Sequence, residues 1–559
     1  MSEYTEDKAP NGAITSSIGS STDCNNTTPE NEKHDDISAE PEKPPRDIEG
    51  WKWWLSVLCI WSSIFFYALD NTVVADIQPV IIDSLGELDK LTWLSVAFLL
   101  GATATNLIWG QIYGHFNAKW TYLLNVFVFE VGSAICGAAP SMNVMIVGRA
   151  LCGVAGAGLY VGVMTLLAMT TTMSERPLYI GGTGLTWGIG IVLGPVIGGG
   201  FSQSSVGWRW AFYINLLIGA VCAPVYLFLL PSKDPRPGVA WKDRTSEIDI
   251  VGAILQAGAL TCFVLAISVG GVTYPWNSGQ VIGCFVASGV LFIILGLQQV
   301  FLVFTTVERR IIPIKFFGSR TILILFSSTA AAGAAAFVPI YMLPLFFQFT
   351  RGDGPLDAGV RLLPFIILMV VTILANGVLL SKLGLYMPWY LVGGLLVVAG
   401  GALMYTVDLD TPTSRIYGYT VLMGLGVGAF IQASFAVAQA VVKPEAVPAA
   451  VGFITLAQFA GITIVMAIAN AIFLNECLTE IPKILPNVPR DEIEAVIQGG
   501  SDLLDTLSSD VRTQVLEAIV SGISKAYVLE ITAGALVAVT SLLMKRERLF
   551  GVSAAVAAA

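Results

Sequence analysis

Three charged residues stand inside long apolar runs of this chain and are the first candidates for chemistry. Asp70 lies late in the first run, Glu130 halfway along the third, and Arg149 in the outer third of the fourth. A charge at membrane depth costs several kcal/mol unless it is paired or hydrated, so such residues often serve ion movement. If the first and fourth runs touch, Arg149 favours the ionised form of Asp70, whereas removal from water favours its protonated form. We therefore predict that these three residues couple protons to transport. The alternatives are a structural ion pair for Asp70 and Arg149, and a packing role for Glu130.

The second half of the chain supplies neutral polar and aromatic side chains within its apolar runs. Amides beside aromatic rings suit a large, weakly polar organic ligand, although each one alone is more often a helix-packing residue. The predicted substrate-cavity residues are Tyr341, Phe347, Gln348, Gln432, Gln439 and Gln458. Glu530 opens the last apolar run, where we expect it at the membrane interface.

A glycine ladder occupies the fifth apolar run. Gly190, Gly194 and Gly198 recur every four residues and so share one helix face, with Gly181 at the start of the run and Pro195 inside it. A face without side chains allows another helix to approach closely, and proline removes one backbone donor and bends the helix. The ladder predicts a bent helix that slides or rocks against a neighbour.

Membrane-spanning helices must position all of these residues. Hydrophobic types make up 55% of the 559 residues and charged types 13%, with a mean hydropathy of +0.73. A soluble domain carries about a quarter charged residues, so a soluble enzyme or a nucleic-acid binder is disfavoured. A bilayer core about 30 Å thick needs about 20 apolar residues per helix. Fourteen continuous runs meet this requirement, and their continuity excludes membrane strands, which alternate. The runs are 53–77, 93–112, 120–139, 142–170, 179–203, 210–231, 250–271, 281–305, 321–348, 362–381, 387–407, 416–442, 448–474 and 526–544.

The runs divide as six, two and six, which predicts an all-α membrane protein built from two six-helix bundles. The first bundle covers 51–231, a linker with an extra helix pair covers 232–312, and the second bundle covers 313–548. Lysine and arginine concentrate in the even-numbered connections, so both termini are predicted to be cytoplasmic. Residues 1–50 contain 12 acidic and 4 basic residues and read as a disordered acidic cytoplasmic tail. Residues 549–559 form a short C-terminal tail.

The connection 475–525 is the long loop on the predicted extracellular side. Val511, Val515, Ile519 and Ile523 follow one another at helical spacing within it. This spacing predicts a short amphipathic helix that lies over the outer mouth.

The motifs resemble those of the major facilitator superfamily, and within it the fourteen-span drug:proton antiporter group. The glycine ladder is similar to the antiporter signature of that group, and residues 149–156 resemble its span 4 motif, whose arginine is implicated in proton transfer. Residues 69–79 look like the span 1 motif, and 208–215 are similar to the start of span 6. The resemblance covers about 51–548 and is strongest to filamentous-fungal members, many of which export toxins or other secondary metabolites.

The loop between the second and third runs departs from the family pattern. An acidic residue usually stands four positions after Gly110, but this position is Gly114, and only Lys119 clearly keeps a base. The charge contact credited with locking the two halves of these transporters is therefore weakened.

The resemblance implies a proton-coupled exporter of small amphiphilic organic molecules that works by alternating access. It needs no cofactor beyond the proton gradient, binds no nucleic acid, and acts as a monomer in the plasma membrane or, alternatively, the vacuolar membrane. The chain has no GxxxxGK[ST] loop for ATP. Two alternatives stay open: an importer or vacuolar exchanger of siderophores, amino acids or polyamines, and a receptor that does not transport. With two histidines and no clustered nucleophiles or metal ligands, an enzyme is disfavoured.

Overall fold

The apolar runs fold as α-helices because a backbone in lipid must satisfy its own hydrogen bonds. The computed structural model describes residues 44–87, 90, 92–271, 274–497 and 503–550. Fourteen helices in this part of the chain are long and apolar enough to cross a membrane, so the predicted number is confirmed. Most of the predicted N-terminal and C-terminal tails lies outside the described residues.

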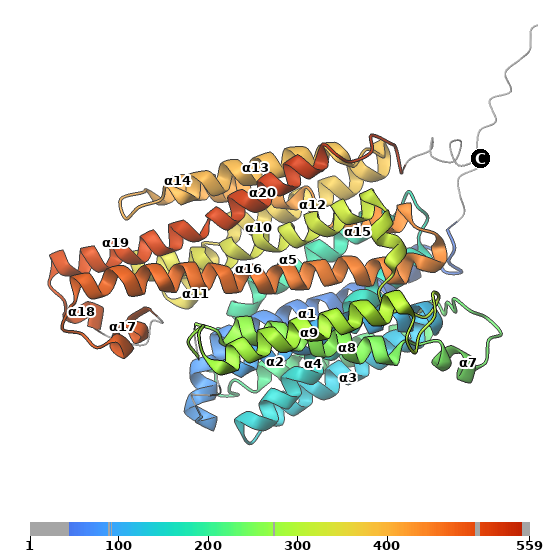
Figure 1. Cartoon of the computed structure of the whole chain (residues 1–559), viewed down its shortest axis with the longest axis horizontal. Helices are drawn as coiled ribbons and strands as arrows, with labels where there is room; N and C mark the ends of the chain where they lie inside the picture. Colours follow the sequence, from blue (N-terminus) through green and yellow to red (C-terminus); the bar gives the residue numbers. More distant parts are fainter. Residues whose placement is uncertain (1–43, 88–89, 91, 272–273, 498–502, 551–559) are drawn as a thin grey trace, which may run out of the picture. The chain divides into compact units, whose positions relative to one another are not determined.

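The first six long helices form one bundle (Figure 1). They are α1 (Gly50–Leu85), α2 (Thr92–His115), α3 (Ala118–Ala138), α4 (Met142–Thr170), α5 (Arg176–Gln203) and α6 (Trp210–Phe228). α4 packs between α2 and α3, and α1 packs along α5. α4 can be so deeply placed because its glycines admit close neighbours: a Cβ atom on Gly153 would lie 2.1 Å from the carbonyl oxygen of Phe98.

The second bundle repeats this plan. Its helices are α10 (Arg320–Arg351), α11 (Pro355–Val360), α12 (Leu363–Leu383), α13 (Met387–Tyr405), α14 (Thr413–Gly428), α15 (Ala433–Val441), α16 (Val447–Ile484), α19 (Ser509–Ala526) and α20 (Val528–Ser541). α10 packs on α16 as α1 packs on α5, and α13 packs on α20 as α3 packs on α6. Such a repeat is common in transporters whose site lies between two bundles.

An extra helix pair, α8 (Ile250–Val269) and α9 (Gly279–Phe301), follows the short helix α7 (Trp241–Ser246). α8 packs on α2 and touches α16. Asp249 ties the base of the pair together: it accepts hydrogen bonds from Gly252 N at 2.7 Å and from Gln299 Nε2 at 2.7 Å. Only 17% of an 18-residue apolar stretch of α9 is buried inside the protein, so most of this helix faces outward.

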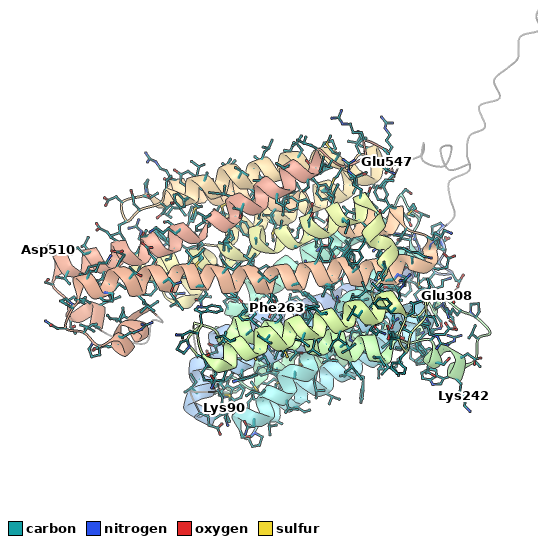
Figure 2. All side chains as sticks on the ribbon, viewed as in Figure 1. Lys90, Lys242, Phe263, Glu308, Asp510 and Glu547 are labelled. Carbon is teal, nitrogen blue, oxygen red and sulfur yellow. The ribbon has the colours of Figure 1, made fainter. Side chains whose placement is uncertain are left out.

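The bundles meet along two seams, one between α5 and α12 and one between α2 and α16. We call the end that carries residues 229–249 the linker end; Lys242, Glu308 and Glu547 mark it in Figure 2, and Lys90 and Asp510 mark the opposite end. The α2–α16 seam is closed near the linker end, where a Cβ atom on Gly452 would lie 3.4 Å from the Cα atom of Gly110.

Two predicted elements differ from the structure. The single run 416–442 is broken between α14 and α15. The loop 475–525 is mostly helical, because α16 continues to Ile484 and α19 begins at Ser509. The predicted amphipathic helix exists as α19, but it packs lengthwise against α16 and does not lie across the mouth, because Val515, Ile519 and Ile523 are buried. Figure 1 shows α16 and α19 running side by side toward the short helices α17 (Arg490–Ile497) and α18 (Leu503–Thr506).

Candidate transport site

Asp70 and Arg149 form a buried ion pair in the first bundle. Asp70 is 0% exposed and Arg149 is 1% exposed, and Arg149 Nη1 binds Asp70 Oδ2. Arg149 Nε also donates to the carbonyl oxygen of Leu94 at 3.1 Å, and its guanidinium lies 4.3 Å from the ring centroid of Phe98. Asp70 Oδ1 has no hydrogen-bond partner among the described residues. The pairing suggested by the sequence is thus formed, with one carboxylate oxygen left over.

Glu130 lies between α3 and α6 and makes no ion pair with Arg149. A Cβ atom on Gly219 would lie 2.3 Å from Glu130 Oε1, so the absence of a side chain at Gly219 makes room for the carboxylate. Both of its oxygens are buried and lack a hydrogen-bond partner among the described residues. The structure therefore holds a second buried acid in the first bundle, outside the ion pair.

Aromatic rings from both bundles meet at the centre of the interface. Tyr67 lies 5.4 Å from Trp187 and 6.2 Å from Phe459, and Tyr160 lies 5.8 Å from Phe435, measured between ring centroids. Tyr160, Trp187 and Phe459 of this central cluster line a small pocket of about 30 Å³, together with the predicted residues Gln432 and Gln458. Tyr160 Oη, Gln432 Oε1 and Gln458 Oε1 have no hydrogen-bond partner among the described residues. Buried polar atoms normally have partners. The two amides lie close to the Tyr160 hydroxyl, so the three side chains form one polar group at this pocket.

Gln432 occupies the break between α14 and α15. The glycines Gly424, Gly426 and Gly428 precede the break, and Asn376 Nδ2 donates to the freed carbonyl oxygen of Ala429 at 3.0 Å. Irregular backbone at membrane depth is tolerated where it is buried in protein or lines a cavity. Because of the break, the Gln432 amide lines the central pocket.

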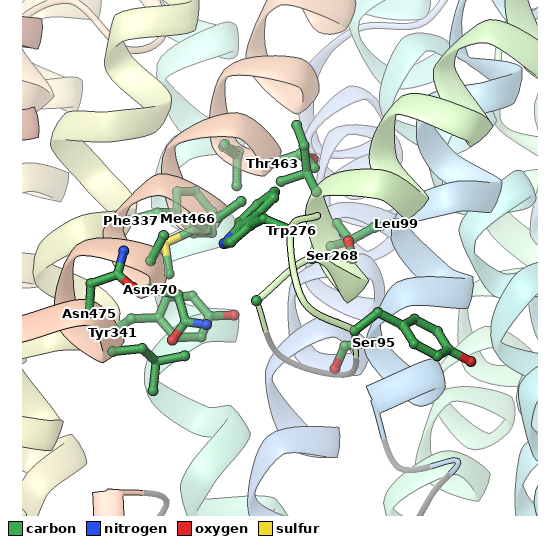
Figure 3. A pocket seen from close by; sticks show the side chains of 18 of the residues that line it. Ser95, Leu99, Ser268, Trp276, Phe337, Tyr341, Thr463, Met466, Asn470 and Asn475 are labelled. Atoms are coloured by element: carbon green, nitrogen blue, oxygen red, sulfur yellow. The ribbon is translucent and has the colours of Figure 1, made fainter. Parts of the chain in front are cut away.

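A larger cavity of about 810 Å³ lies beside the central pocket, toward the end opposite the linker. It shares Phe337 and Ile462 with the central pocket, and the predicted residue Tyr341 lines it. Its further described lining includes Asn71, Gln78, Ser95, Leu99, Trp276, Thr463, Met466, Asn470 and Asn475, many of which Figure 3 displays. Aromatic and aliphatic walls with scattered amides are typical of sites for organic ligands, whose volumes run from about 300 to 1,000 Å³.

The ion pair lies directly behind one wall of this cavity. Asn71, Ser95 and Leu99 face the cavity, and each is the chain neighbour of a residue in the ion-pair environment. Asp70 precedes Asn71. On α2, Leu94 and Phe98 contact Arg149, and they immediately precede Ser95 and Leu99. A change at the ion pair therefore reaches the cavity wall through one residue of backbone.

The glycine ladder packs on two neighbours. Cβ atoms on Gly190 and Gly194 would lie 2.5 Å from Ala68 Cβ and 2.1 Å from Thr72 Oγ1, so this face receives α1 on both sides of Asp70. The Cβ atom of a residue at Gly181 would lie 3.4 Å from the carbonyl oxygen of Ile373 on α12. Pro195 lies within α5 and approaches Gly359, and Gly198 is buried. The ladder joins the ion-pair helix to the seam between the bundles.

Three predicted cavity residues lie away from both cavities. Gln348 is exposed and lines neither. Phe347 is buried under the Arg361 guanidinium, 4.6 Å from its ring centroid. Gln439 is buried but lines a recess of about 390 Å³ at the linker end.

Glu530 is fully buried against α13, not at an interface as predicted, because α19 and α20 prolong the last span beyond the apolar run. Neither of its carboxylate oxygens has a hydrogen-bond partner among the described residues, and the same holds for Tyr527 Oη one turn earlier.

Residues of the linker contact His115, the residue next to Gly114. Arg244 donates to both carboxylate oxygens of Asp234 at 2.9 Å, which holds the pKa of Asp234 below its ordinary value. The same guanidinium donates to the carbonyl oxygen of His115 at 3.1 Å, and His115 Nε2 lies 3.5 Å from Glu247. These contacts belong to the first bundle and its linker. Across the seam, a Cβ atom on Gly114 would meet only the Cβ atom of Pro448 in the second bundle, at 4.0 Å.

Several site residues escaped the sequence reasoning. Tyr67, Tyr160, Trp187 and Phe459 read as ordinary apolar positions, and only the ring contacts across the interface reveal that they form one cluster. Tyr67 stands one turn before Asp70, and this proximity was the one available signal.

The Major Facilitator Superfamily sequence profile matches residues 60–466. The chain belongs to the major facilitator superfamily. It is similar to the MFS-type transporter pgmG of Aspergillus terreus, with 53% identity over 92% of each chain. It is also similar to the efflux pump alnA of Emericella nidulans, with 47% identity over 93% of this chain and 95% of that one.

The fold agrees with this membership. The crystal structure of the human organic anion transporter MFSD10 (TETRAN) superimposes with a TM-score of 0.54, covering 87% of this chain and 100% of that one at 12% identity. A superfamily member with fourteen candidate spans among its described residues is a multi-pass membrane transporter and not an enzyme.

Proposed function

We propose that this superfamily member is a proton-coupled exporter of small amphiphilic organic molecules, in particular secondary metabolites. The observation that carries the proposal is the buried Asp70–Arg149 pair directly behind the cavity wall. Asp70 is the proton carrier, and Arg149 is the partner whose hold on α1 weakens when Asp70 is protonated. The glycine ladder transmits this change, because Gly190 and Gly194 contact α1 beside Asp70.

The cavity chemistry supports an amphiphilic substrate. No acidic side chain is among the described residues that line the large cavity or the central pocket. A polycation such as a polyamine would need such acids, so import or exchange of polyamines is disfavoured. Aromatic walls with amides suit a molecule with an extended apolar part and a few hydrogen-bonding groups.

Transport proceeds by alternating access between two conformations. In support, the described seams are closed near the linker end, where Asn106 Nδ2 donates to the carbonyl oxygen of Gly452 at 2.8 Å, while the large cavity lies toward the other end. The excess of basic residues in the connections at the linker end supports a cytoplasmic position for that end. We propose that the chain acts as a monomer, because one chain supplies both seams and both cavities. The plasma membrane is the proposed location, since export from the cell requires it.

The test is accumulation of a fluorescent amphiphile in pump-deficient cells that express the full chain, with and without a protonophore. Export predicts lower accumulation than in control cells, and the protonophore should abolish the difference. Higher accumulation would show import, and accumulation unchanged across a broad panel would favour the receptor alternative. A difference that survives the protonophore would contradict proton coupling.

A further inference from the structure

The loop between α8 and α9 forms part of the wall of the large cavity. Ser268, Tyr274 and Trp276 of this extra pair line the cavity together with residues of both bundles. Trp276 is 42% exposed, although it is a large apolar side chain. The pair therefore does more than occupy space beside α2, and its loop presents an aromatic surface to whatever enters the cavity.

The loop is built to hold Trp276 in place. A Cβ atom on Gly270 would lie 2.6 Å from Trp276 Cζ3, and one on Gly271 would lie 2.6 Å from Trp276 Nε1. The indole thus rests on two glycines, and Gly271 has a φ of +76° that favours glycine. Gly271 N donates to the carbonyl oxygen of Tyr274 at 2.8 Å, which closes the turn, and Phe285 stacks on the indole with ring centroids 6.5 Å apart.

The opposite wall complements an aromatic surface. Phe337 on α10 and Met466 on α16 supply apolar contacts, and Asn470 on α16 supplies an amide. Figure 3 shows Trp276 projecting from the α8–α9 side toward these residues. A flat apolar molecule placed between the two walls would be covered by the indole on one side and could bind the amide at its edge.

We propose that Trp276 is a specificity-determining residue that selects substrates with a planar aromatic or conjugated part. The inference rests on the proposed export function, for which it names the substrate class and the contribution of the extra helix pair. Stacking of one aromatic ring changes a binding constant by about twofold to tenfold. The selection acts in the large cavity, beside the central pocket and not within it.

The test uses the purified full chain in lipid nanodiscs and equilibrium dialysis with two neutral probes. 4-Nitroquinoline N-oxide is planar and aromatic, whereas cycloheximide contains no aromatic ring. Trp276→Ala should raise the Kd of the planar probe about threefold to tenfold and leave the Kd of cycloheximide within twofold. Trp276→Phe should restore most of the planar affinity.

Two further variants separate stacking from general damage. Gly270→Ala keeps the indole but displaces it, so it should weaken binding of the planar probe as Trp276→Ala does. Phe292→Ala removes an exposed ring from α9 that lines no described cavity and should change neither Kd. Equal effects of Trp276→Ala on both probes, no effect on either, or no binding of the planar probe to the wild-type chain would overturn the proposal.

The result is distinguishable from failure of the export function. Cells that express the wild-type chain should resist 4-nitroquinoline N-oxide, and Trp276→Ala should reduce this resistance about threefold or more. A chain that binds the planar probe through Trp276 without protecting cells would contradict export and leave the binding assignment intact.

Discussion

Arg149 Nη1 makes two contacts with Asp70. It binds the carboxylate oxygen Oδ2, and it donates to the backbone carbonyl oxygen of Asp70 at 3.2 Å. The second contact does not depend on the charge of Asp70. Protonation of the carboxylate would therefore loosen the pair without freeing α1 from α4. This arrangement suits a coupling step that must be reversible within each transport cycle.

The first prediction concerns Asp70→Asn, which keeps the shape of the side chain and removes its titration. We expect proteoliposomes with this variant to exchange substrate down its gradient but not to concentrate it in response to a pH gradient. A full response to the pH gradient would remove Asp70 from the coupling role. Glu130→Gln in the same assay tests the second buried acid, which makes no ion pair with Arg149.

The stability of the pair gives a second prediction. Arg149→Met leaves a buried carboxylate without its partner and should lower the free energy of unfolding by about 3–5 kcal/mol. Adding Asp70→Asn to this variant should recover part of the loss, because the double variant leaves no unpaired charge at the site of the pair. Thermal unfolding of the purified variants measures both effects. An equally unstable double variant would show that packing around the guanidinium, and not its charge, holds α1 to α4.

The glycine ladder gives a third prediction. In Gly194→Ala the new Cβ atom would lie 2.1 Å from Thr72 Oγ1, so α5 must move away from α1. Overpacking of this kind costs about 1–3 kcal/mol, and we expect lower thermal stability together with lower transport. Gly199→Ala on the same helix is the matched control, since nothing lies within 4 Å of its Cβ position. Similar behaviour of the two variants would contradict the close α1–α5 contact.

The amide in the α14–α15 break gives a fourth prediction. Gln432→Leu removes a hydrogen-bonding group from the central pocket while keeping a similar volume. Loss of one hydrogen bond corresponds to about a threefold to tenfold weaker substrate affinity, measured as the concentration for half-maximal transport. Gln348→Leu, at an exposed position outside both cavities, should leave this concentration unchanged. If Gln348→Leu changes the concentration for half-maximal transport more than Gln432→Leu does, the substrate does not bind at the central pocket.

The fifth prediction concerns the pH dependence of the linker. Arg244 lowers the pKa of Asp234 below its ordinary value of 3.8, so the pair stabilises the fold fully above that value and loses this contribution as the pH falls through the lower, folded-state pKa. The melting temperature of Asp234→Asn should be below that of the wild type by the same amount at every pH between about 5 and 8. The difference should shrink only in stronger acid. A difference that vanishes between pH 5 and 8 would contradict the lowered pKa.

The number of spans and the repeated bundles could be predicted from the sequence because apolar length and composition determine them. The Asp70–Arg149 contact could be predicted only on the condition that the first and fourth runs touch, which the structure shows. The first two features depend on position along single helices. They need no knowledge of how side chains from distant helices meet.

The predictions that differ from the structure depend on how helices pack against one another. The break before Gln432 lies within an apolar stretch, and its glycines are common in membrane helices that stay intact. Phe347 and Gln348 share a helix with Tyr341, and only the rotation of α10 decides which of them faces the cavity. Glu530 was expected at the interface because the apolar run begins close to it, whereas the candidate span, made of α19 and α20, begins at Ser509.

The two seams between the bundles are unequal. α5 is packed against α12 from Gly181 beside Ile373 to Gly188 beside Val370, and Pro195 of α5 then lies beside Gly359 of the preceding helix α11, so this seam is long. The α2–α16 seam borders the large cavity instead. The α8–α9 pair stands beside this second seam, since α8 packs on α2 and touches α16. The extra pair therefore screens the large cavity along this side, and its Ser268 and Trp276 belong to the cavity lining.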